Sequence, residues 1–124
     1  MAVTQEHARQ SIDKIQSGPV LMQWRKEHKI SRSLFAKVAD VSERTLADYE
    51  GRKALPAKSI RPVTEAVRLI QALADLAGDD VALKEWLNQP NPAFGKQTPL
   101  SLIESGKSDV LWKMAYQIRG GSFA

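Results

Sequence analysis

The side chains best suited to contacting another molecule lie between residues 42 and 53 of the 124-residue chain. Five of them project from the polar side of one predicted helix: Ser42, Glu43, Arg44, Thr45 and Asp48. An Arg guanidinium donates two hydrogen bonds to guanine, a Thr contacts a thymine methyl group or a phosphate, and a Glu accepts from cytosine N4. These groups match the donors and acceptors that base edges present in a DNA major groove.

Candidates for phosphate contacts flank this helix, with Arg32 and Ser33 before it and Arg52 and Lys53 after it. Arg32 and Ser33 are expected at a helix N-terminus, where backbone N–H groups also favour phosphate. From residue 42 to 53, the three acids, Glu50 among them, equal the three bases in number. A monomer with so balanced a helix is expected to bind weakly. The expected DNA-binding form is therefore a homodimer on a palindromic operator.

Residues 32–51 must position these groups, and their pattern predicts two short helices joined by a tight turn. The first helix has an apolar face of Phe35, Ala36 and Ala39. The second helix has one of Leu46 and Tyr49, and Val41 is expected to fill the angle between the two helices. Ser42 is a natural N-cap for the second helix, which is expected to run to Glu50 and to end at Gly51 as a C′ residue. A small residue, a turn and a capped helix are typical of a helix-turn-helix.

The run LFAKVADVSERTLADYEGRK resembles the helix-turn-helix of the Xre/Cro-like repressors. The resemblance implies double-stranded operator DNA as a partner, with the second helix in the major groove. Asp40 stands where that family usually has Gly in the turn, at a position of positive φ. Asp tolerates this region better than most residues, so the turn is expected to form at some cost.

Charge is unevenly distributed along the chain, whose net charge is +4. Residues 1–62 hold 12 Lys and Arg against 7 Asp and Glu, and residues 63–124 hold 6 against 7. The basic half is the half with the predicted helix-turn-helix, as phosphate binding requires. The chain has no cysteine, which excludes disulfides and thiolate metal sites. No signal-like or membrane-spanning run is present, so we expect a cytoplasmic protein with no membrane contact.

The predicted fold is all-α: a helix-turn-helix unit followed by a small helical domain for partner binding or dimerisation. We expect a polar N-terminal arm at 1–18, the DNA-binding domain at 19–61, and the second domain at 62–124 with a flexible tail. Pro62 is expected to open a long helix that ends near Ala77. Caps at Asp79 or Asp80, at Thr98 and at Ser108 predict three further helices.

The last predicted helix, from Ser108 to about Arg119, has two different faces. Val110, Leu111, Met114, Ala115 and Ile118 form the face expected in the core. Trp112, Tyr116 and Arg119 follow an i, i+4, i+7 spacing on the other face. These residue types are over-represented at interface hot spots, so the stripe indicates either a partner protein or packing on another helix of the chain or its dimer mate.

Residues 86–124 resemble the C-terminal toxin-binding domain of the Xre/MbcA/ParS antitoxins. The motifs follow in the order Trp86-Leu87, Pro90-Asn91, Gly95, Thr98-Pro99-Leu100 and Gly106, then the terminal helix ending in Gly. The resemblance implies an antitoxin that covers the active site of a RES-domain toxin, an enzyme that consumes NAD or transfers ADP-ribose, and represses its own operon. It implies toxin contacts by the last helix and tail, expected at Trp112, Tyr116, Arg119, Gly120, Gly121, Ser122 and Phe123.

An enzyme is not expected, because His7 and His28 lie in separate segments without a nucleophile or a metal-ligand spacing. We therefore expect no catalytic residue, no metal and no cofactor. Two alternatives to the antitoxin stay open. One is a free-standing dimeric Xre-type transcriptional regulator. The other is a protein-interaction module that has lost DNA binding.

Overall fold

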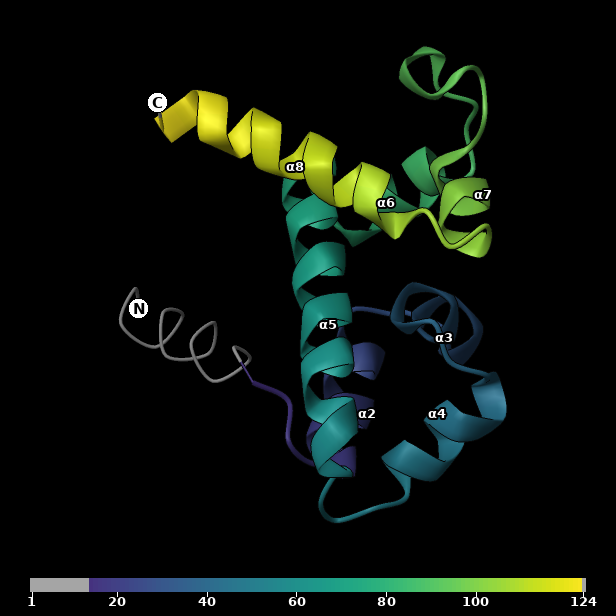
Figure 1. The fold of residues 1–124 in the computed structure, drawn as a ribbon, viewed down its shortest axis with the longest axis vertical. Helices are drawn as coiled ribbons and strands as arrows, with labels where there is room; N and C mark the ends of the chain where they lie inside the picture. Colours follow the sequence, from purple (N-terminus) through teal and green to yellow (C-terminus); the bar gives the residue numbers. More distant parts are fainter. Residues whose placement is uncertain (1–13, 124) are drawn as a thin grey trace. The chain divides into compact units, whose positions relative to one another are not determined.

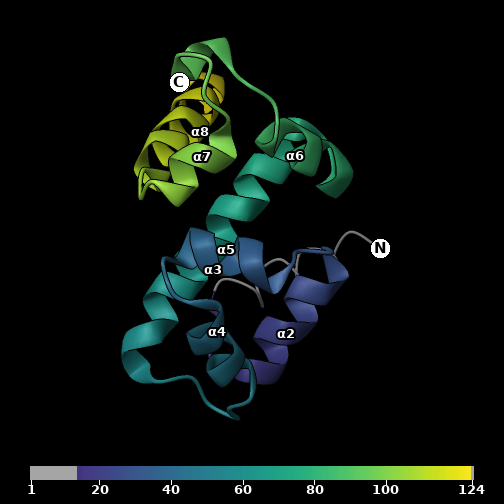
Figure 2. The ribbon, with the colours of Figure 1, turned by 90° about the vertical axis from the view of Figure 1, so that its right-hand side faces the viewer.

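The computed structural model describes residues 14–123, which contain seven α-helices and no strand. The helices are α2 (Gly18–Glu27), α3 (Arg32–Ala39), α4 (Glu43–Glu50), α5 (Ala57–Ala77), α6 (Asp80–Leu87), α7 (Pro99–Glu104) and α8 (Ser108–Phe123). A 3₁₀ turn, η1, spans Pro92–Phe94. The predicted all-α fold is confirmed (Figures 1 and 2). The chain divides into unit 1, Met1–Arg68, and unit 2, Leu69–Ala124, so α5 contributes to both.

Unit 1 contains two short helices, α3 and α4, that are joined by a tight turn and pack on neighbouring helices. The helix α4 packs against both α2 and α3, and Figure 2 shows all three gathered beside the first half of α5. The core of the unit consists of Ile15, Leu21, Trp24, Ile30, Phe35, Ala36, Ala39, Leu46, Leu55, Val63, Ala66 and Val67. Ile15 is fully buried, and its N–H donates to Thr64 Oγ1 at 3.1 Å. The end of the predicted N-terminal arm is thus anchored, whereas residues 1–13 lie outside the described residues.

The start of α2 lies directly against the end of α4. Ser17 caps α2, and the Gly18 N–H donates to Arg52 O at 2.9 Å. A Cβ on Gly18 would lie 2.4–2.6 Å from the carbonyl oxygens of Tyr49, Glu50 and Arg52. Only glycine permits so close an approach.

The long helix α5 begins at Ala57, five residues before the predicted start at Pro62. Its first turn forms because both the N–H and the hydroxyl of Ser59 donate to Pro56 O, at 2.9 and 2.7 Å. Ser59 and Val63 are both buried, so the helical face facing the core starts before the proline. Pro62 is exposed within the helix and costs it one backbone hydrogen bond.

Unit 2 is built from short, individually capped helices. Asp79 caps α6 by accepting from Ala82 N at 2.7 Å, and Thr98 caps α7 by accepting from Ser101 N at 3.0 Å. Gly106 follows α7 with φ +76°, a left-handed conformation that is common for glycine just after a helix. The buried apolar residues of this unit are Leu69, Ile70, Ala72, Leu73, Leu83, Leu87, Leu102, Ile103, Leu111 and Ala115.

The last helix, α8, differs from its prediction in length. We expected it to end near Arg119 and to be followed by a flexible tail, but the backbone is helical to Phe123. Glycine lowers helix stability by about 1 kcal/mol relative to alanine without forbidding the conformation, so Gly120 and Gly121 do not end the helix. Figure 1 shows the second half of α8 running away from α6 and α7.

Candidate nucleic-acid interface and partner-binding helix

The turn between α3 and α4 has the geometry of a helix-turn-helix. Asp40 takes the left-handed conformation predicted for it, with φ 58° and ψ 45°. Its own N–H and that of Val41 return to carbonyls of α3, the latter to Ala36 O at 3.0 Å. This left-handed residue ends α3 and redirects the chain into α4.

Ser42 caps α4 as predicted and also orients Thr45. Its Oγ accepts from Thr45 N at 3.0 Å and donates to Thr45 Oγ1 at 2.9 Å. The Thr45 hydroxyl therefore accepts from within the protein and keeps its own proton for an outside acceptor. Phosphate oxygens and the purine N7 are acceptors of this kind.

The outer face of α4 is available to a ligand. Glu43 and Arg44 are exposed and Thr45 is half-buried, whereas Leu46 is fully buried beneath them. Within residues 14–123, the Arg44 side chain has no hydrogen bond or ion pair. Its guanidinium is free to bind a base edge or a phosphate. Lys53, just beyond the helix, is also exposed.

Two of the predicted DNA contacts bind each other. Arg52 Nε donates to Asp48 Oδ2 at 2.9 Å, and both side chains are more than half exposed. An exposed i, i+4 pair is weak, so a phosphate can compete for Arg52. The arrangement also neutralises Asp48, which removes one repulsive charge from the face of α4.

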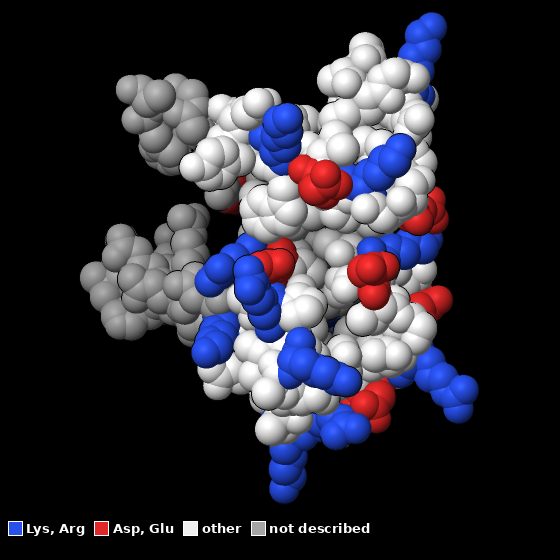
Figure 3. Space-filling model, viewed as in Figure 1, with Lys and Arg blue, Asp and Glu red and all other residues white. Residues whose placement is uncertain are grey.

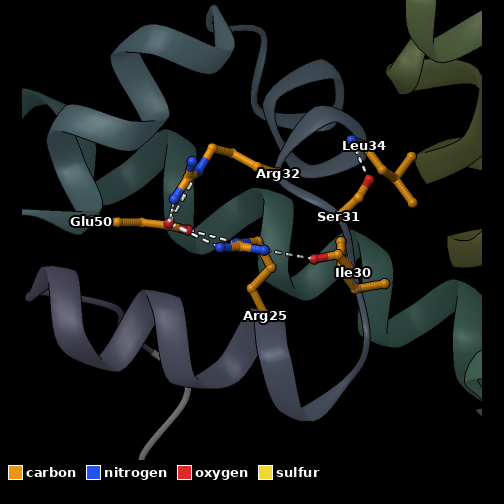
Figure 4. A network of polar contacts seen from close by, with 6 residues as sticks. All are labelled: Arg25, Ile30, Ser31, Arg32, Leu34 and Glu50. Atoms are coloured by element: carbon orange, nitrogen blue, oxygen red, sulfur yellow. Dashed lines mark hydrogen bonds and ion pairs between the residues drawn. The ribbon is translucent and has the colours of Figure 1, made fainter.

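Glu50 is not on this face. Its side chain is only 1% exposed and lies between two arginines (Figure 4). Arg25 binds it with Nε to Oε2 at 2.6 Å and Nη2 to Oε1 at 2.9 Å. Arg32 binds Oε1 with Nε at 3.3 Å and Nη2 at 3.1 Å. The network joins α2, α3 and α4.

Burial of the Glu50 carboxylate raises its pKa. The hydrogen bonds and charges of Arg25 and Arg32 lower this pKa by more than burial raises it. The net effect is a pKa below the usual value, so Glu50 is ionised at neutral pH. The third donor of Arg25, Nη1, binds Ile30 O at 3.1 Å and fixes this guanidinium in the interior.

This network bears on two sequence-based expectations. Glu50 was counted among the acids that balance α4, yet it is buried and neutralised, so the exposed face is less acidic than expected. Arg32, predicted as a candidate for a phosphate contact, is bound to Glu50, and its side chain is 44% exposed. The helix α4 runs to Glu50 as predicted, and Gly51, expected as its C′ residue, is its C-cap with φ −83°. Ser33, the other candidate at the start of α3, is half-buried.

Arg25 was missed by the sequence analysis. It lies four residues after Leu21 on α2, and Glu50 lies four residues after Leu46 on α4, with both leucines fully buried. Opposite charges in register with two apolar stripes were the available signal for a buried ion pair.

Positive charge accompanies this surface. In the face drawn in Figure 3, Lys and Arg side chains gather over the helices of unit 1. Arg61, on the first half of α5, is 89% exposed in its side chain and makes an i, i+4 pair with Glu65. Such side chains are suited to phosphate rather than to base contacts.

The second candidate surface lies on α8. Leu111 and Ala115 are buried and attach the helix to unit 2, whereas Trp112 is half-buried and Tyr116 is 77% exposed. The two described side chains of the predicted stripe, Trp112 and Tyr116, are therefore accessible to solvent. Ile118, expected in the core, is instead 49% exposed, because it lies on α8 beyond its buried residues. The side chains of Arg119, Ser122 and Phe123, and the surroundings of Gly120 and Gly121, lie outside the described residues.

A loop built around Asn91 precedes α7. Asn91 Oδ1 accepts from Ala93 N at 2.9 Å, and the Asn91 backbone pairs with Gln97. Trp86 and Phe94 make an edge-to-face contact, with ring centroids 6.3 Å apart, that fixes η1 on α6. Gly95 takes φ +64° in this loop.

Within residues 14–123, no group of three or more His, Asp or Glu side chains is arranged to hold a metal ion. In the same residues, no helix is both long and apolar enough to cross a membrane.

Comparison with known families gives a match to the C-terminal half of the chain. Residues 72–112 match the model of the antitoxin Xre/MbcA/ParS C-terminal toxin-binding domain. The matched segment runs from α5 through α6 and α7 to Trp112 on α8. No curated protein and no solved structure gave a significant match. The match supports an antitoxin of a toxin–antitoxin system, with a toxin as partner, and it suggests a regulatory protein rather than an enzyme.

Proposed function

We propose that this chain, whose residues 72–112 match an antitoxin toxin-binding domain, neutralises a RES-domain toxin through α8 and represses its own operon through α4. The observation that carries the proposal is the combination of this match with a separate helix-turn-helix unit. Neither the identity of the toxin nor the operator follows from the match. Both come from the resemblance of the chain's motifs to the antitoxin family.

The toxin contacts are proposed on the outer stripe of α8. Trp112 and Tyr116 present a large aromatic surface with a polar group, which suits the centre of a protein interface. The residues from Gly120 to Phe123 continue α8 beyond the stripe, which ends at Arg119. In this proposal, the end of α8 enters the active-site cleft of the toxin and blocks it.

The DNA contacts are proposed on α4 and around it. Arg44 and Thr45 are placed for base edges, with Ser42, Glu43 and Asp48 on the same face, and Ser33, Arg52 and Lys53 for phosphates. Because one α4 offers so few base contacts, the proposed form is a homodimer in which two α4 helices occupy successive major-groove half-sites.

Growth assays test the antitoxin role. The adjacent reading frame is expressed alone, with the full chain, or with a chain that ends at Ile118. Toxicity that the full chain suppresses and the truncated chain does not would assign inhibition to the end of α8. If no adjacent product is toxic, the antitoxin proposal loses its support. The chain is then better regarded as a dimeric regulator.

A pair of neighbouring variants sharpens this test. Tyr116→Ala should weaken toxin binding by about 2 kcal/mol, roughly thirtyfold in Kd, because it removes an exposed aromatic anchor. Gln117→Ala is the matched control, since Gln117 is also exposed on α8 but lies off the stripe. Calorimetric titration with the toxin measures both, and equal effects of the two variants would contradict the assignment of the stripe.

A further inference from the structure

Glu50 has two arginine partners of unequal quality. Arg25 uses three donors within the interior, two on the Glu50 carboxylate and one on Ile30 O. Its side chain is 10% exposed. Arg32 reaches only Oε1, the oxygen that Arg25 Nη2 already binds, and its side chain is 44% exposed. The stronger partner therefore suffices to neutralise Glu50, and the weaker partner is surplus to that requirement.

The three charges sum to one positive charge at the edge of the helix-turn-helix. The side chain of Arg32 is the only one of the three that is exposed to a substantial extent, at 44% against 10% for Arg25 and 1% for Glu50. A phosphate offers Arg32 shorter, charge-assisted hydrogen bonds than the 3.1 and 3.3 Å contacts with Glu50. Leaving Glu50 costs little, because Arg25 remains on both carboxylate oxygens.

We propose that Arg32 exchanges partners when DNA binds: it leaves Glu50 for a backbone phosphate while Arg25 keeps Glu50 neutralised. The inference rests on the proposed DNA-binding function and adds a regulatory role for Glu50. Glu50 lowers the affinity for DNA without touching it, because each binding event must first break the Arg32–Glu50 contacts. Arg25 is a positioning residue that holds α4 against α2 in both states.

Salt dependence of binding provides the first test. The full chain is titrated against a labelled mixed-sequence duplex of about 30 base pairs, long enough for two half-sites. Loss of one phosphate contact lowers the slope of log K against log salt by about 0.9 per protomer, and we expect this for Arg32→Ala. The midpoint of thermal unfolding should hardly change. Lys107→Ala is the charge-matched control from an exposed position in unit 2 and should keep the wild-type slope.

A double-mutant cycle provides the second test, because it separates exchange from a static contact. With Arg32 present, Glu50→Gln should strengthen DNA binding by about threefold to fivefold, the range of a weak ion pair. In an Arg32→Ala background, the same substitution should have a much smaller effect. If Glu50→Gln does not fold, Glu50→Asp takes its place, since it keeps the buried charge and shortens the side chain.

The outcomes distinguish failure of the proposed DNA-binding function from failure of the proposed exchange by Arg32. A wild-type chain that shows no salt-dependent DNA binding contradicts the DNA-binding function itself. Wild-type binding with an unchanged slope in Arg32→Ala contradicts the phosphate contact. A reduced slope with equal effects of the Glu50 substitution in both backgrounds shows that Arg32 stays on Glu50, and it overturns the exchange.

Discussion

The two units hold their candidate binding helices in different ways. In unit 1, α4 is fixed at both ends, by the Ser42 cap at its start and by Gly18 and the Glu50 network at its end. In unit 2, the described side chains of α8 are buried only at Leu111 and Ala115, and those after Ala115 are exposed. A helix that is fixed in advance pays little conformational entropy on binding, which suits the proposed insertion of α4 into a DNA groove. The end of α8 instead leaves apolar surface for a partner to cover.

In unit 1, the largest loss of stability is expected where a substitution would disturb the close backbone contacts between α2 and α4. Gly18→Ala should destabilise the protein by about 3 kcal/mol, because the new Cβ would lie 2.4–2.6 Å from three carbonyl oxygens that cannot move independently. Gly51→Ala is the matched control: its Cβ would lie 3.6 Å from the nearest atom, Asp48 O, and φ is −83°. We expect it to be neutral or slightly stabilising. Urea unfolding measures both, and similar losses would refute the close-packed junction.

The ion network should have the next largest effect. Arg25→Met keeps most of the side-chain volume but removes the principal partner of a buried carboxylate. The expected loss is about 2 kcal/mol, less than for a fully orphaned buried charge, because Arg32 still binds Glu50. Arg52→Met breaks an exposed pair with Asp48 and should cost less than about 0.5 kcal/mol. Equal losses in urea unfolding would mean that burial of the network contributes nothing.

The same network predicts a pH dependence. The Glu50 pKa is lower in the folded protein than in the unfolded chain, so the stabilisation is present above the unfolded pKa, near 4.3, and is lost as pH falls through the folded pKa. The free-energy difference between wild type and Arg25→Met should therefore shrink under acid conditions. Unfolding measured at neutral pH and between about pH 5 and 3 tests this. A constant difference would mean that Glu50 is not the group being protonated.

The sequence predicted α3, α4 and the turn between them well because their signals are local. Asp40 acts through its own backbone conformation, and Ser42 accepts from a backbone N–H three residues away, as Thr98 does in unit 2, so residue type and position suffice. The Arg25–Glu50 pair joins residues 25 positions apart, and its formation depends on how α2 packs against α4. The early start of α5 was missed for a related reason, since Pro62 dominated the pattern while burial of Ser59 and Val63 decided the outcome.

Unit 2 offers a smaller and purely local effect. Thr98→Ala removes the oxygen that accepts from Ser101 N and should cost about 1 kcal/mol, the usual value of an N-cap. Thr98→Ser retains the hydroxyl and is the matched control. If the short helices of unit 2 depend on their caps, only the alanine variant should lower the midpoint of thermal unfolding. Loss of stability in both variants would place the contribution in the Thr98 methyl group instead.

The smallest expected effect is a gain in the free energy of unfolding, and it comes from a substitution in the turn between α3 and α4. Asp40 holds φ 58°, a region that is strained for a residue with a Cβ. Asp40→Gly relieves this strain but adds freedom to the unfolded chain, so the net stabilisation should be only about 0.5 kcal/mol. Asp40→Ala has the Cβ without the polar group that tolerates this region, and it should destabilise. Opposite signs in urea unfolding would show that the turn, and not the Asp40 charge, sets the stability here. A gain in both variants would point to repulsion by the carboxylate, and the fixed geometry of α4 would then depend less on this residue than on Gly18 and Glu50.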